Sequence, residues 1–212
     1  MTLPANKLIT VNDRGARAAT TFGSVAAAGG NMVFIKKLTA SSSATLSFVD
    51  GASGVVLDNT YKEYLFTFKD IHPQTDGVKF QVGFRDGGTD YDATKTTSFF
   101  QALHSENNAN AEIGYTSSLD LAQSTGFQPL CESLGSDADQ NVSGELTIYN
   151  PASTTFVKHF LYSGNETHSN DKIHSAKVAG YCNLTGYLDG VQFKMSSGNI
   201  DSGVIKLYGI GG

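Results

Sequence analysis

Tryptophan is absent from this 212-residue sequence, and cysteine, proline and charge are scarce, with two Cys, four Pro and 17% charged residues. The shortage of charge leaves room for 23 glycines and for many Ser, Thr and Asn, which suit turns. No apolar run approaches the length of about 20 residues that a membrane-spanning helix needs. The net charge of −5 argues against a nucleic-acid partner, because phosphate contact requires a basic surface.

The only two cysteines, Cys131 and Cys182, lie about fifty residues apart, outside any spacing typical of a metal site. The N-terminus lacks a charged segment followed by an apolar one, so we expect no secretory signal and synthesis in a cytoplasm. A reducing compartment favours two buried free thiols over a disulfide.

From Met32 onward, short segments with a period of two predict β-strands separated by Gly, Asn and Asp turns. The clearest covers residues 78–85, in which Val or Phe alternates with polar residues or glycine. Residues 191–208 are typical of strand, turn and strand, so we expect a closing hairpin with Val191, Phe193 and Met195 on the core. Roughly nine or ten such strands without long helices predict an all-β fold, an antiparallel β-sandwich.

Three segments also contain distinctive sequence motifs. These are the run from Ser197 to Gly203 (SGNIDSG) with the following LYG at 207–209, Ile71-His-Pro73, and Val56-Leu-Asp-Asn-Thr-Tyr61. Together they resemble a family of small virion structural proteins of tailed bacteriophages, especially marine and cyanobacterial phages, over roughly residues 40–212. The resemblance implies a jelly roll among sandwiches, a place in a virion, frequent trimers and no reaction.

Residues 1–31 differ from the rest, since they contain almost no large apolar side chains and cannot bury enough surface to order alone. They are either a flexible terminus or an extended arm that orders against a neighbouring subunit, and we adopt a docking arm at 1–31 followed by a sandwich at 32–212.

Metal ligation finds little support in the sequence. Asp86, Asp90 and Asp92 around two glycines resemble a calcium-binding turn, but they lack the EF-hand spacing, and Asp and Gly also dominate ordinary turns. Asp137 and Asp139 are interpreted in the same way.

The histidines are weak candidates too. His168 and His174 lie in a polar segment with His159 upstream, and a third ligand is not evident. We interpret all three as surface or turn histidines.

No catalytic motif is present, neither a Gly-x-Ser-x-Gly elbow nor His-Glu-x-x-His nor a phosphate-binding loop. We therefore assign no catalytic, cofactor-binding or metal residue, and we expect a protein that is not an enzyme and has no cofactor.

The sequence thus predicts an accessory structural protein on the exterior of a phage particle, synthesised in the bacterial host. Its partners would be the major capsid protein or tail and fibre proteins, as well as copies of itself in a homotrimer. The chain has no repeat or coiled coil for a fibre shaft, which favours capsid decoration.

One alternative is a carbohydrate-binding module for host surface glycans, with Tyr91, Tyr115, Phe127 and Tyr162 as stacking residues. A polysaccharide depolymerase has less support, because no pair of carboxylates stands out.

Overall fold

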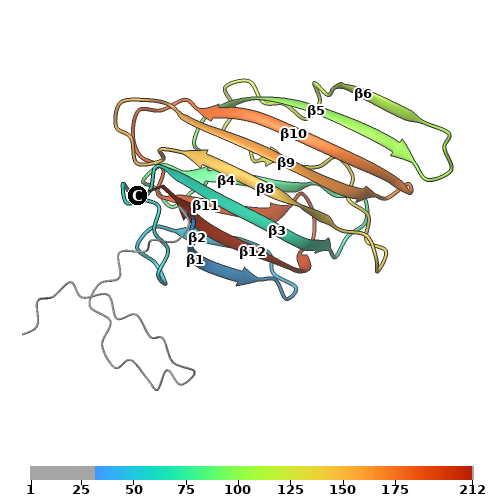
Figure 1. Cartoon of the computed structure of the whole chain (residues 1–212), viewed down its shortest axis with the longest axis horizontal. Helices are drawn as coiled ribbons and strands as arrows, with labels where there is room; N and C mark the ends of the chain where they lie inside the picture. The colour runs from blue at the N-terminus through green and yellow to red at the C-terminus, as the bar shows by residue number, and fades with distance from the viewer. Residues whose placement is uncertain (1–31, 212) are drawn as a thin grey trace, which may run out of the picture. The chain divides into compact units, whose positions relative to one another are not determined.

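The computed structural model of the chain describes residues 32–211 (Figure 1). The docking arm predicted for residues 1–31 lies outside this range. The described residues contain no helix and form twelve strands, which are in chain order β1 (Met32–Thr39), β2 (Leu46–Val49), β3 (Glu63–Pro73), β4 (Phe80–Arg85), β5 (Lys95–Ser105), β6 (Ala111–Tyr115), β7 (Gln128–Pro129), β8 (Val142–Tyr149), β9 (Lys158–His168), β10 (Lys172–Cys182), β11 (Gly190–Met195) and β12 (Ile200–Ile210).

The strands form two antiparallel sheets that pack against each other as a β-sandwich, which confirms the predicted fold class. The larger sheet has eight strands in the order β1-β12-β3-β8-β9-β10-β5-β6, and the smaller has four in the order β2-β11-β4-β7. In Figure 1 the large sheet runs from β1 at one edge to β6 at the other.

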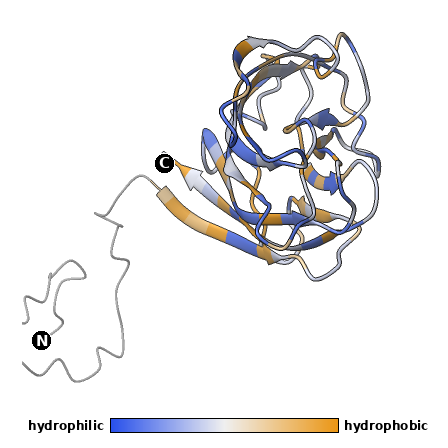
Figure 2. Cartoon of the chain, turned by 90° about the vertical axis from the view of Figure 1, so that its right-hand side faces the viewer, coloured by the Kyte–Doolittle hydropathy of each residue, from blue (hydrophilic) through white to orange (hydrophobic). Residues whose placement is uncertain are grey.

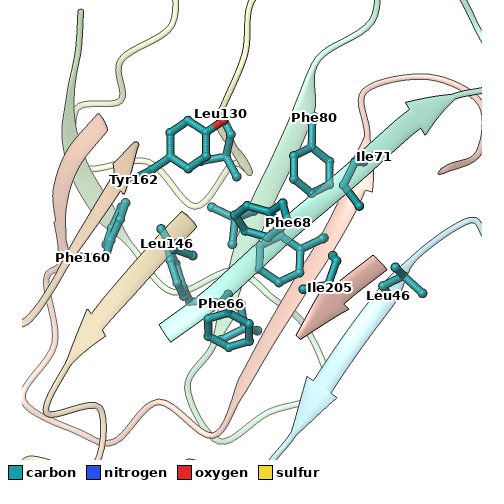
Figure 3. Packing of buried hydrophobic residues seen from close by; sticks show 14 of the residues in the cluster. Leu46, Phe66, Phe68, Ile71, Phe80, Leu130, Leu146, Phe160, Tyr162 and Ile205 are labelled. Atoms are coloured by element: carbon teal, nitrogen blue, oxygen red, sulfur yellow. The ribbon is translucent and has the colours of Figure 1, made fainter. Parts of the chain in front are cut away.

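The core lies between the sheets and consists mainly of phenylalanine and aliphatic side chains, as the lack of tryptophan leads one to expect. Phe68 of β3 packs on Phe80 of the small sheet, and Leu146 of β8 lies between Phe66 and the residues Phe160 and Tyr162 of β9 (Figure 3). The period of two that predicted these strands places alternate residues on this core, so the opposite residues of the large sheet point outward.

The predicted closing hairpin is wrong. β11 pairs with β2 and β4 in the small sheet, whereas β12 pairs with β1 and β3 in the large one. Two glycines with positive φ, Gly198 at +68° and Gly203 at +121°, lie in the connection and in the first part of β12. The chain therefore crosses from one sheet to the other here, and the inward residues Phe193 and Ile205 belong to opposite layers.

Cys131 and Cys182 are both buried and free, which confirms the prediction of two buried thiols. Within residues 32–211 no helix is long and apolar enough to cross a membrane.

Candidate functional site

The side of the large sheet that faces away from the core exposes an unusual number of apolar side chains. We call it the outer face, and its apolar residues include Met32, Phe34, Leu65, Phe100, Ile113, Tyr115, Tyr149, Leu161, Ile173, Tyr181 and Tyr208. Leu161 is 48% exposed, Tyr115 58% and Ile113 80%. Antiparallel sheets with one solvated face normally place polar residues there, so this face has the composition of a covered surface.

Cross-strand register shows that several of the outer apolar residues lie in one row. Leu161 of β9 lies between Ala179 of β10 and Thr147 of β8, and Leu65, Tyr208 and Phe34 continue the row to β1. At that end Phe34 and Tyr208 meet edge to face with ring centroids 5.7 Å apart. The first half of β1 is hydrophobic (Figure 2). The row thus crosses six neighbouring strands, from β10 to β1, and Thr147 of β8 is its one polar member.

The outer face is hollowed where small residues interrupt the aromatic ones. Ala179, Leu161 and Tyr149 line both of two adjacent depressions, and the small methyl group of Ala179 fills little of the space beside Leu161. Phe100 and Lys177 line one depression, and His159 and Tyr181 line the other. The face therefore combines apolar area with a shallow relief.

The two edges of the large sheet are formed by β1 and β6. Every residue of β6 is exposed, and no other strand within residues 32–211 pairs with its free edge. An exposed edge strand with residues such as Ile113 and Tyr115 is a surface for pairing with another chain.

The interpretation of His168 and His174 as surface or turn residues is wrong. His168 ends β9 and His174 follows on β10 across a short turn, and their side chains are 8% and 2% exposed. Both occupy inward positions of the hairpin, so their rings meet with centroids 4.5 Å apart. His159 has the opposite parity on β9 and lies exposed on the outer face, away from this pair.

Two glutamates complete this buried group. Glu166 is directly opposite His174 in the β9–β10 ladder, and Glu132 comes from the segment between β7 and β8. His174 Nδ1 lies 3.4 Å from Glu132 Oε2 and 3.5 Å from Glu166 Oε1. The alternation of inward and outward residues along the hairpin could have indicated that Glu166, His168 and His174 lie on the same side. No neighbouring sequence feature indicated that Glu132 joins them.

Burial sets the ionisation of this group. It lowers the pKa of His174 to about 4 and lowers the pKa of His168 as well, because a charged ring loses hydration. Burial also raises the pKa of the Glu166 carboxyl. Hydrogen bonds from the backbone N–H groups of Glu132 and Ser133 stabilise the carboxylate and oppose this rise. At neutral pH both imidazoles are therefore unprotonated, and each ring carries one lone pair.

The four residues considered for glycan stacking are not brought together. Tyr162 is buried in the core, and Phe127 lies beneath Lys194, whose Nζ is 4.3 Å from the ring centroid. Tyr91 is half-buried. Only Tyr115 belongs to the outer face.

The aspartates of the two acidic turns are all exposed. Within residues 32–211 the group of metal-ligating side chains that lies close enough to hold an ion is Glu132, His168 and His174, which includes none of these aspartates. Their positions are those of ordinary turn residues.

Comparison of the chain with protein-family models, with curated proteins and with solved structures finds no match.

Proposed function

We propose that this protein is an accessory structural protein on the exterior of a phage particle. It acts by burying the outer face against other protein chains, without catalysis. The mainly apolar row across six strands is the observation that carries the proposal, since exposed apolar patches of this kind mark interaction sites on proteins. Capsid decoration is the preferred position, and attachment to a tail or fibre is the other.

We further propose that eight of the strands form a jelly roll. Lettering β1, β2, β3, β4, β7, β8, β11 and β12 as B to I gives the orders B-I-D-G and C-H-E-F in the two sheets. The hairpins β5–β6 and β9–β10 are then two insertions, and their four strands extend the first sheet beyond β8 in the order β9-β10-β5-β6. Jelly rolls form capsid and lectin domains, so this topology supports a virion role.

A second copy of this chain is the occupant that fits the outer face best. Phe100, Lys177, Ser163 and Glu145 follow one another across four strands, and beyond Thr67 the row continues to Lys206 and Lys37. The face therefore offers apolar area together with charges of both signs. A surface with both signs can complement itself, and association would also cover the exposed edge strand β6. A homotrimer is the state that the family resemblance implies.

Substituting Leu161 by aspartate should dissociate the oligomer, because it places a charge in the middle of the apolar row. Light scattering at micromolar concentration should give a multiple of 22.5 kDa for the wild type and 22.5 kDa for the variant. Tyr187→Asp is the matched control, since Tyr187 is 52% exposed but lies between β10 and β11. A monomeric wild-type protein would contradict self-association through this face.

Deleting residues 1–31 should leave a folded β-domain, because all twelve strands lie between Met32 and Ile210. Circular dichroism and thermal unfolding should be close to those of the full chain. If the segment is a docking arm, the truncated protein should enter particles at reduced occupancy, measured on purified virions. Full occupancy would remove the docking role while leaving the outer face as the attachment surface.

The most direct test of the proposed function is the location of the protein on an intact particle by cryo-electron microscopy. We expect density for a sandwich of this size at symmetric exterior sites. Absence from purified particles of the phage that encodes it would refute the proposal.

Host-glycan binding is the second candidate, and the relief of the outer face favours it. Tyr149 and Tyr181 flank the depression above Ala179, with His159 beside them as a polar group. Aromatic rings beside polar groups are suited to stacking on sugar faces. A glycan array with wild type and Tyr149→Ala separates the two functions, since cohesion alone predicts no specific signal.

A further inference from the structure

The buried histidine–glutamate group between β9, β10 and the β7–β8 segment carries more negative charge than its surroundings balance. The Glu166 side chain is 1% exposed and that of Glu132 is 36% exposed. Within residues 32–211 no lysine or arginine forms an ion pair with these carboxylates, and the ring that faces both of them, His174, is uncharged at neutral pH. A buried carboxylate is costly unless it is paired or coordinates a metal ion.

The polar atoms of this group also lack the hydrogen bonds that buried groups normally have. Neither ring nitrogen of His174 has a partner within the described residues, and Glu166 Oε2 lacks one as well. Most buried side-chain polar atoms in native proteins are satisfied, so several orphans at one place need an explanation. His174 is only 2% exposed and points its Nδ1 toward both carboxylates.

The donor atoms are spaced for a shared ligand. One ligand atom each of Glu132, His168 and His174 lies within 4.8 Å of the other two. Imidazole nitrogen and carboxylate oxygen are donors that zinc and neighbouring first-row metals accept. The half-exposed side chain of Glu132 also leaves a route by which an ion can enter.

The surroundings hold these donors in place. Gln101 Nε2 donates to Glu132 Oε2 at 2.7 Å, and the N–H groups of Glu132 and Ser133 donate to Glu166 Oε1. Such second partners orient metal ligands. His168 is the weakest donor, because its Nδ1 already accepts the Asn170 N–H at 3.0 Å and this contact must open before that atom can coordinate.

We propose that Glu132, His168 and His174 bind a divalent transition-metal ion, with zinc as the first candidate, and that Glu166 balances its charge. The ion would join the β7–β8 segment to the β9–β10 hairpin. Its role is structural and does not depend on the proposed place of the protein in a virion.

Zinc titration of the chelator-treated full chain tests the proposal, with binding followed by calorimetry and by thermal unfolding. We expect one zinc ion per chain and a rise in Tm, with little response to magnesium. Glu132→Gln keeps the size of the side chain and an acceptor for Gln101, and it should weaken binding by about tenfold or more. His174→Gln should do the same, and His168→Gln should have a smaller effect.

His159→Gln is the matched control, because His159 lies on the same strand as His168 but on the outer face. It should bind zinc as the wild type does. Lack of binding by the folded wild type would overturn the proposal. So would unchanged affinity in both Glu132→Gln and His174→Gln, since zinc would then bind elsewhere on the surface.

Discussion

Replacing Phe193 by alanine should lower the free energy of unfolding by about 3–5 kcal/mol, the range for a large aromatic side chain in a close-packed core. Phe193 of β11 is fully buried. Its ring packs edge to face against Phe66 and Phe68, with centroid distances of 5.5 and 5.1 Å, and stacks on Phe80 at 5.7 Å. The first two rings come from the opposite sheet, so alanine would leave a cavity in the middle of the sandwich.

Denaturant unfolding measures this loss, and the neighbouring Lys194→Ala provides its control. Lys194 points to the other side of the strand, where its ammonium group lies over the ring of Phe127. Both side chains are half-buried, and such a cation–π contact contributes about 1 kcal/mol, so the control should lose about that much and well below the loss at Phe193. Equal losses at the two positions would mean that Phe193 is not the centre of the core.

Gly203→Ala should lower the free energy of unfolding by about 3 kcal/mol, because two penalties combine there. The φ of Gly203 is +121°, which L-residues rarely adopt. A Cβ at this position would also lie 2.6 Å from the carbonyl oxygen of Asp70 and 2.7 Å from Ile71 Cα. Backbone atoms of a paired strand cannot yield as a flexible side chain would.

Gly51→Ala separates these two penalties. Gly51 has a φ of +73°, and an added Cβ would have no atom within 4 Å. It should therefore cost only the backbone term of about 1–2 kcal/mol. Thermal or denaturant unfolding of both variants gives the difference, and a Gly203→Ala variant as stable as Gly51→Ala would rule out the steric clash.

Alternation along the sequence predicted which residues face the core more reliably than it predicted which strands are neighbours. Phe80, Val82 and Phe84 are fully buried as expected, because a strand with one covered face needs a period of two. The same pattern in residues 191–208 suggested a hairpin, although the two strands belong to different sheets. Periodicity reports the face of a residue, whereas the partner depends on the path of the connection.

The buried polar residues were missed for a related reason. Lys95 and Lys158 are fully buried and donate from Nζ to backbone carbonyls, those of Gly126 and Phe156 among them. Polar residues in a strand are normally assigned to the solvent side, so His168 and His174 were also expected at the surface. The alternation along the β9–β10 hairpin indicates that Glu166, His168 and His174 share one side, whereas Glu132 reaches them only through the tertiary fold.

The pairing of β1 with β12 has a consequence for how the domain folds. The first described strand finds its partner only when the last has been synthesised, and β2 must likewise wait for β11. Contacts between such distant segments carry a large loop-closure cost, which slows folding of all-β domains to milliseconds or seconds. During translation the early strands leave the ribosome with their edges unpaired, so they remain open to chaperones until the C-terminal strand arrives.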